Sequence, residues 1–212
     1  MNISKILNSD ATYPSNLKRY LTEDAPKSFS FIGNLDILKK KTLAVFCSVK
    51  CPGNLILKTY DLAKQLREAG GTVISGFHSP MEKECLNILL RGKQPVIISP
   101  ARSIEGMRIK GEYKKILKDE RLLIISPFDG KNNRISLRRA AERNLFVAAI
   151  ADSIFVTYAA KESKTEAFCR EILAWEKPVY TFEDESNANL IALGAKPLNP
   201  SAISNSEKAF LF

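Results

Sequence analysis

The sequence has 212 residues, of which 45% are hydrophobic and 26% are charged, a balance that suits a single domain with one sizeable core. Its 32 Lys and Arg against 23 Asp and Glu give a formal net charge of +9, which is compatible with a polyanionic partner such as nucleic acid. No stretch approaches the ~20 apolar residues of a membrane-spanning helix, and residues 1–5 lack the cationic start of a secretion signal. We therefore expect a soluble, cytoplasmic protein with no membrane partner.

The chain divides by pattern into three regions. A Tyr-Pro step at 13–14 and three lysines at 39–41 indicate a helical N-terminal extension followed by a basic linker, together covering residues 1–41. The main domain is expected over residues 42–198. The Asn-Pro-Ser sequence that opens residues 199–212 is typical of a weakly ordered tail.

Six short apolar runs, each followed by a polar corner and an amphipathic segment, are the most informative feature of the main domain. Runs that are apolar on both faces suit strands of a parallel sheet covered by helices on each side. Their alternation with helical segments implies strand-helix-strand crossovers. The runs are residues 43–47, 72–74, 95–98, 122–125, 153–156 and 178–180.

The helices between these runs are expected at residues 55–69, 80–90, 134–151 and 164–175. The first ends at the Gly-Gly stop signal that follows it, and the second opens with a proline after a serine cap. The predicted fold class is therefore α/β and Rossmann-like: an open, mostly parallel sheet with helices on both faces. Its functional surface is expected where the parallel strands end.

Four of the six predicted strands are followed by serine, namely Ser48, Ser75, Ser99 and Ser126. Because the carboxyl ends of parallel strands meet at one edge of the sheet, we expect a row of small hydroxyls lining a crevice there. Hydroxyls and the unpaired N–H groups of helix N-termini both suit phosphate. Serine also caps helices and turns after strands, so a structural role is an equal alternative.

The sequence carries no familiar nucleotide or metal motif. No Gly-x-Gly-x-x-Gly follows the first predicted strand and no P-loop is present, which disfavours a conventional NAD site and a P-loop nucleotidase. The four cysteines, Cys47, Cys51, Cys85 and Cys169, lack the paired spacing of a zinc site. We expect buried, reduced thiols, with no metal and no cofactor.

The lone histidine, His78, follows Gly76 and Phe77 at a predicted strand end. This position suits contact with a ligand better than the apolar face of a helix does. Because no partner cysteine or aspartate is visible for a triad, we interpret His78 as a packed or ligand-facing loop residue.

Basic residues concentrate where a loop enters the third predicted helix, at Lys131, Arg134, Arg138, Arg139 and Arg143. The four-residue spacings crowd like charges on one side of that helix, which costs stability unless an anion compensates. A phosphate-binding surface explains this cost. The alternative is a solvated helix face that Glu142 partly neutralises.

A polar loop also joins the fifth predicted strand to its helix. Here Ser163 and Thr165 either cap the helix or contact phosphate, with Lys164 between them. Glu166 suits the first helical turn through the helix dipole alone.

From about Tyr13 to Leu198 the chain resembles the Rossmann-like core of the DprA/Smf DNA-processing proteins, part of a wider nucleotide-binding superfamily. The residues that carry the resemblance, in chain order, are Tyr13-Pro14 with Leu17, Ile32-Gly33, Ser75-Gly76-Phe77, Arg143-Asn144-Leu145, Lys164-Thr165-Glu166-Ala167 and Asn189-Leu190-Ile191 with Gly194-Ala195. Each is weak alone, and their order makes them fairly specific. The family's Gly-Ser-Arg after the first strand is replaced by Cys47-Ser48-Val49, with Lys50 as the nearest cation.

The resemblance implies single-stranded DNA binding by a basic groove, homodimerisation and assistance to a RecA-type recombinase, without catalysis. Lys50, Arg102, Lys131, Arg134, Arg139 and Arg143 are then the expected phosphate contacts, with Asn144 beside them. Phe77, Phe128 and Tyr158 are the aromatic candidates for base stacking. Two alternatives stay open: a small nucleotide-binding sensor or nucleoside-monophosphate phosphoribohydrolase, and an interaction scaffold with a vestigial crevice.

Overall fold

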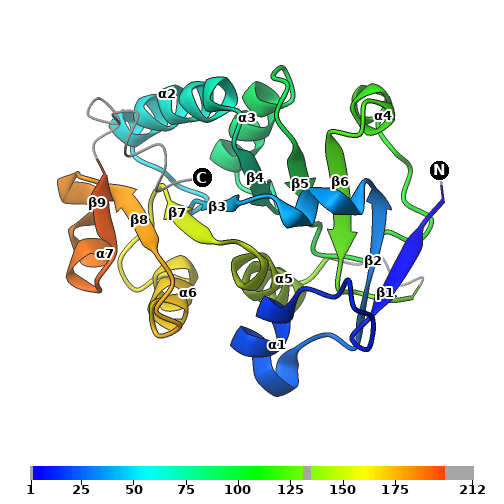
Figure 1. The fold of residues 1–212 in the computed structure, drawn as a ribbon. Helices are drawn as coiled ribbons and strands as arrows, with labels where there is room; N and C mark the ends of the chain where they lie inside the picture. The colour runs from blue at the N-terminus through cyan, green and yellow to red at the C-terminus, as the bar shows by residue number, and fades with distance from the viewer. Residues whose placement is uncertain (1, 131–134, 199–212) are drawn as a thin grey trace.

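The computed structural model describes residues 2–130 and 135–198. Its strands form one nine-stranded sheet in the order β1-β2-β6-β5-β4-β3-β7-β8-β9 (Figure 1). Strands β1 and β2 pair antiparallel, as do β2 and β6, and all other pairs are parallel. The strands are β1 Ser4–Leu7, β2 Ser28–Gly33, β3 Thr42–Phe46, β4 Thr72–Ser75, β5 Val96–Ile98, β6 Leu122–Ser126, β7 Ser153–Val156, β8 Val179–Phe182 and β9 Lys196–Leu198.

Helices cover both faces of this sheet, with α2, α3 and α4 on one face and α1, α5 and α6 on the other (Figure 1). The open, mostly parallel α/β arrangement predicted from the sequence is confirmed. None of the described helices is both long and apolar enough to cross a bilayer. The helices are α1 Ser15–Leu21, α2 Gly53–Ala69, α3 Pro80–Leu89, α4 Gly111–Lys118, α5 Leu137–Ile150, α6 Lys164–Leu173 and α7 Ala188–Ala192, with short 3-10 turns at Thr22–Asp24, Leu35–Lys39 and Glu185–Asn187.

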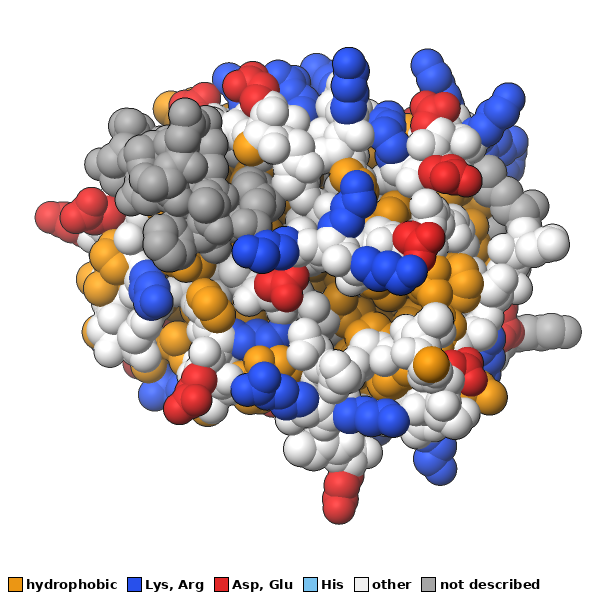
Figure 2. All heavy atoms as spheres, viewed as in Figure 1, with side chains coloured by type: hydrophobic (Ala, Val, Ile, Leu, Met, Phe, Trp, Pro, Cys, Tyr) orange, Lys and Arg blue, Asp and Glu red, His pale blue; other side chains and the backbone are white. Residues whose placement is uncertain are grey.

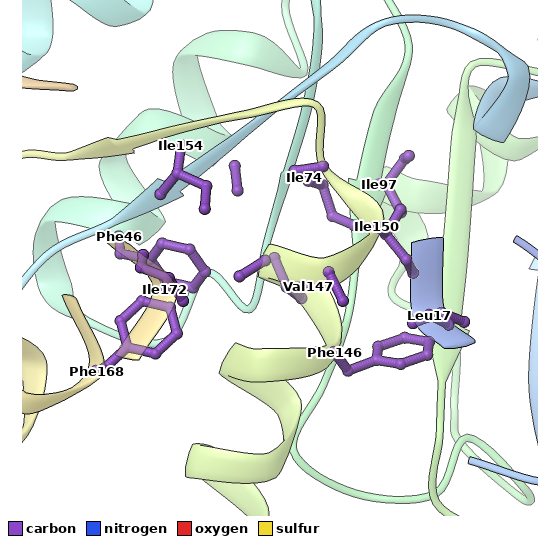
Figure 3. Close-up of a cluster of buried hydrophobic side chains, with 14 of the residues drawn as sticks. Leu17, Phe46, Ile74, Ile97, Phe146, Val147, Ile150, Ile154, Phe168 and Ile172 are labelled. Carbon is purple, nitrogen blue, oxygen red and sulfur yellow. The ribbon is translucent and has the colours of Figure 1, made fainter. Parts of the chain in front are cut away.

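Alternate residues of the same strands fill two separate cores. In β3, Ala44 and Phe46 face the side of α5 and α6, whereas Leu43 and Val45 face α2 and α3. The first core is drawn in Figure 3, where strand residues meet aromatic and aliphatic side chains of α5 and α6. Because strands buried on both faces need apolar residues at every position, they are visible in the sequence as continuous runs.

The N-terminal region differs from the helical extension predicted for residues 1–41. Strands β1 and β2 extend the sheet there, and α1 packs beside α5. In β2, Phe29 and Ile32 are buried in the cores, and Ser28 and Ser30 are also buried, so polar residues interrupt the apolar run. The last residue of this strand, Gly33, has φ +109°, and a Cβ there would lie 2.2 Å from the Leu122 carbonyl oxygen. The expected tail at 199–212 lies outside the described residues.

The two edge strands of the described sheet are β1 and β9. Strand β9 is only three residues long, and its exposed residues are Lys196 and Pro197. Strand β1 carries Lys5, which forms an ion pair of 3.0 Å with Asp129.

A buried lysine closes the C-terminal end of α5. Lys177 is 7% exposed, and its Nζ donates hydrogen bonds of 2.7 Å to the carbonyl oxygens of Ala148 and Ala149, and a third to that of Ala151. Ala148 and Ala149 lie in the last turn of α5 and Ala151 follows its last residue, so the lysine meets carbonyls that the helix end leaves unpaired and where positive charge is favoured. The same Nζ lies 4.2 Å from the Tyr20 ring centroid, so the lysine also joins α5 to α1.

Replacing this lysine with an apolar side chain of similar length tests its role. We expect Lys177→Met to lower the free energy of unfolding by about 3 kcal/mol, because three buried carbonyls lose their donor. The measurement is urea denaturation, with Lys196→Met as the matched control at an exposed lysine. A loss equal to that of the control would contradict the assignment.

Candidate nucleic-acid interface

Six parallel strands, from β6 to β8, place their carboxyl ends along one edge of the sheet. The chain order reverses at β3, which has β4 on one side and β7 on the other. In open α/β sheets the carboxyl edge at such a reversal is the usual place for ligands. At this point the Ser48 N–H donates to the Tyr158 carbonyl at 2.9 Å and the Ala160 N–H donates to Ser48 Oγ at 3.4 Å.

The four predicted serines lie at or just after the ends of four neighbouring strands, β6, β5, β4 and β3, and therefore form the expected row. Their hydroxyls, however, do not line an open crevice. Ser75, Ser99 and Ser126 have no exposed surface, and Ser48 is 8% exposed. The expectation of solvent-facing hydroxyls is therefore wrong for this structure.

The turns that follow the strands explain why these serines face inward. Ser75 Oγ accepts a hydrogen bond of 3.2 Å from the Phe77 N–H. Ser126 Oγ accepts one of 3.2 Å from the Phe128 N–H and donates one of 2.8 Å to the Arg102 carbonyl. These two hydroxyls thus stabilise their own strand-end turns, as the structural alternative predicts, whereas Ser99 Oγ has no hydrogen-bond partner among the described residues.

Arg143 is buried against the end of β4, although the sequence suggested a surface phosphate contact. Its side chain is 4% exposed, and Nη1 donates to the Ser99 carbonyl at 3.2 Å. A Cβ built on Gly76 would lie 0.8 Å from Nη1, so the guanidinium occupies the space that any larger residue would need. Burial lowers the pKa of Arg143, and the charge of Glu82 acts in the opposite direction. Arg143 Nε has no hydrogen-bond partner among the described residues.

A buried glutamate that the sequence reasoning missed joins the ends of β3 and β4. Glu82 is 6% exposed; its Oε1 accepts from the Cys47 N–H at 3.0 Å, and its Oε2 accepts from the N–H groups of His78 and Ser79 at 2.8 and 3.2 Å. Ser79 Oγ in turn accepts from the Glu82 N–H at 3.2 Å. The Ser-x-x-Glu spacing of this capping box was the available signal in the sequence.

The loop before α6 is built in the same way. Ser163 Oγ accepts from the Glu166 N–H at 3.2 Å, and Glu166 Oε2 accepts from the Glu162 N–H at 2.8 Å. Hydrogen bonds from the Asn189 side chain and the Glu162 backbone hold the pKa of Glu166 below its usual value. Ser163 therefore caps α6, while Thr165 is half-buried.

Several cationic side chains remain outside these buried networks. Lys50 after β3, Lys161 before α6 and Lys164 at the first position of α6 are exposed. Arg139 is half-buried, and its guanidinium carbon lies 5.5 Å from the Phe128 ring centroid. Arg138 is exposed and pairs with Glu142 at 2.7 Å, as the alternative of a partly neutralised helix face requires.

The remaining predicted site residues occupy varied positions. His78 is exposed, Arg102 and Asn144 are half-buried, and Lys131 and Arg134 lie outside the described residues. Within residues 2–130 and 135–198 no group of three or more His, Cys, Asp or Glu is arranged to hold a metal ion. Figure 2 shows Lys and Arg scattered over one face with Asp and Glu between them, so net charge alone does not mark a site.

A family model for DNA recombination-mediator protein A matches residues 4–206 of this sequence. The chain belongs to that family. Protein Smf of Borreliella burgdorferi is 28% identical over 157 residues, which are 72% of this chain and 48% of that protein. The chain thus spans about half the length of this curated relative.

Solved structures of other proteins share this fold. DNA processing protein A of Streptococcus pneumoniae superposes with a TM-score of 0.77 at 19% identity, covering 96% of this chain and 74% of that one. Its namesake from Helicobacter pylori, whose single-stranded DNA binding mode has been described, gives 0.77 at 18% identity, with coverages of 99% and 97%. The molybdenum cofactor carrier protein of Chlamydomonas reinhardtii gives 0.55 at 14% identity, with coverages of 81% and 99%.

The contact between Arg143 and Gly76 can be tested by adding one methyl group. We expect Gly76→Ala to lower the free energy of unfolding by about 2 kcal/mol or more, because the new Cβ overlaps the guanidinium. The measurement is chemical denaturation with a double-mutant cycle against Arg143→Ala, in which the combined loss should fall short of the sum. Gly53→Ala is the matched control, since a Cβ there meets nothing within 4 Å; equal stabilities of the two alanine variants would refute the contact.

Proposed function

We propose that this chain is a DNA-processing protein that binds single-stranded DNA along the carboxyl edge of its sheet and assists a RecA-type recombinase as a homodimer. The observation that carries the proposal is the Arg139 guanidinium over the Phe128 ring, at the N-terminal end of α5. A cation beside an aromatic ring offers both a phosphate contact and a stacking surface, which single-strand binding requires.

The exposed lysines extend this surface across the edge. Lys50, Lys161 and Lys164 follow β3 and β7, the two strands between which the chain order reverses. They present positive charge without base-specific geometry, which suits sequence-independent phosphate binding. The proposed contacts are Lys50, Arg102, Arg139, Lys161 and Lys164.

The aromatic candidates differ in their availability for stacking. Phe128 and Tyr158 are half-buried, so each retains surface that a base can cover. Phe77 is 5% exposed and packs in the core with α2 and α3. The proposed stacking residues are therefore Phe128 and Tyr158.

Membership of the recombination-mediator family and the printed description of the Helicobacter pylori structure support the choice of single-stranded DNA. The nucleotide-binding alternatives receive less support, because the strand-end hydroxyls that would meet a mononucleotide are buried. No structural observation favours the scaffold alternative.

Binding is tested by fluorescence anisotropy with labelled oligo-dT at several salt concentrations. We expect Lys50→Ala and Arg139→Ala each to weaken binding roughly 3- to 10-fold and to reduce the salt slope by about 0.7, the value for one lost phosphate contact on a single strand. The matched control is Lys41→Ala, because Lys41 is an exposed lysine at the opposite end of the strand that precedes Lys50.

The outcomes separate the candidate functions. Binding that weakens with salt and with both site variants, but not with the control, supports the proposal. Absence of binding by the unmodified protein at low salt would refute it. In that case mononucleotides are screened next by calorimetry, since affinity for one of them would favour the sensor alternative.

A further inference from the structure

Three of the four cysteines gather between α2 and α3, beside the candidate interface. Cys47 and Cys85 belong to a small buried cluster with Met81, and Cys51 packs against it. None of the four cysteines is in a disulfide. The sequence predicted buried thiols throughout, but Cys51 is only partly buried, so one member of the group is open to solvent.

An open groove of about 660 Å³ gives solvent access to this group. Its lining includes Cys51, the neighbouring Lys50 and the α3 residues Met81 and Lys83. Small solutes can therefore reach Cys51 through a groove that is lined by Glu84 as well as by the two lysines. Cys47 and Cys85, at 7% and 4% exposure, lie beneath it.

The thiols of Cys47 and Cys51 differ in the direction of their pKa shifts. Interaction between the two thiols lowers the pKa of Cys51, and the same interaction together with burial raises the pKa of Cys47. Burial raises the pKa of Cys85 to about 12 and that of Cys169 to about 12. Thiolates react with peroxides whereas thiols do not. Cys51 is therefore expected to react first, and Cys47 is expected to attack the oxidised sulfur of Cys51.

We propose that Cys51 and Cys47 form a peroxide-sensitive pair that closes reversibly into an intramolecular disulfide. The proposal is independent of DNA binding and goes beyond the proposed function. It rests on the cluster that holds the buried Cys47 and against which Cys51 packs, and on the open groove that Cys51 lines.

The reaction balances with a hydroperoxide as the oxidant. The Cys51 thiolate attacks the peroxide, the O–O bond breaks, and sulfenic acid forms while the leaving oxygen takes a proton to become water or an alcohol. The Cys47 sulfur then attacks the sulfenic sulfur, and its thiol proton leaves with the hydroxyl as water. Two thiols are oxidised by two electrons in total, and the peroxide is reduced.

Formation of the disulfide between Cys47 and Cys51 would constrain the segment that follows β3. Lys50 lies between the bonded residues, and Gly53 opens α2 directly afterwards. The Cys47 N–H is already fixed by Glu82, so the adjustment to disulfide geometry falls on the Cys51 side of the loop.

Peptide mapping tests the proposal on the full chain. The protein is treated with hydrogen peroxide, the excess is removed with catalase, and remaining thiols are blocked with N-ethylmaleimide during denaturation. Trypsin then cuts after Lys41, Lys50 and Lys58. The cut after Lys50 separates the two cysteines. We expect peptides 42–50 and 51–58 joined by a disulfide, loss of two of the four thiols, and full recovery with dithiothreitol.

Three variants sharpen the result. Cys51→Ser should abolish the linked peptide, Cys47→Ser should leave Cys51 to proceed to sulfinic acid, and Cys169→Ser should react as the unmodified protein does. At limiting peroxide we expect Cys51 to be modified at least roughly tenfold faster than Cys169.

Other outcomes overturn the proposal. A link between peptides 51–58 and 84–91 would assign the partner to Cys85 instead of Cys47. Disulfide-linked dimers on a non-reducing gel, or sulfinic acid at Cys51 with an intact Cys47 thiol in the unmodified protein, would exclude an intramolecular pair. Equal modification rates at Cys51 and Cys169 would exclude special reactivity.

Discussion

The contact between the Arg143 guanidinium and Gly76 holds together the carboxyl edge of this sheet. Arg143 extends from α5 to the end of β4, fills the space above Gly76 and donates to the carbonyl after β5. One side chain thus fixes a helix to two strand ends. Two segments that are distant in the sequence meet here, namely Ser75-Gly76-Phe77 and Arg143-Asn144-Leu145. The contact between them stabilises the fold.

Two buried carboxylates near this edge form hydrogen bonds with backbone N–H groups. Glu82 and Glu166 accept hydrogen bonds from loop N–H groups and cap α3 and α6 from within. The lysines at 50, 161 and 164, by contrast, are exposed. In the proposed function these lysines would contact phosphates, and the backbone networks would keep their loops in place.

The sequence predicted the parallel strands because burial on both faces leaves mostly apolar residues in them. It did not reveal β2, whose buried serines interrupt the apolar pattern, or α4, which begins at Gly111 without a side-chain cap. The positions of the strand-end serines were predicted correctly, but their exposure was not, because a hydroxyl can satisfy its own turn as well as a ligand. The inward direction of Arg143 depends on tertiary packing around α5, which periodicity alone cannot show.

The edge strands limit how two copies of this protein can associate. A strand joins the side of another sheet only where a run of backbone N–H and C=O groups is free to pair. Strand β9 is three residues long and carries a proline, which has no N–H to donate, next to an exposed lysine. Continuation of the sheet across β9 into a second copy is therefore disfavoured.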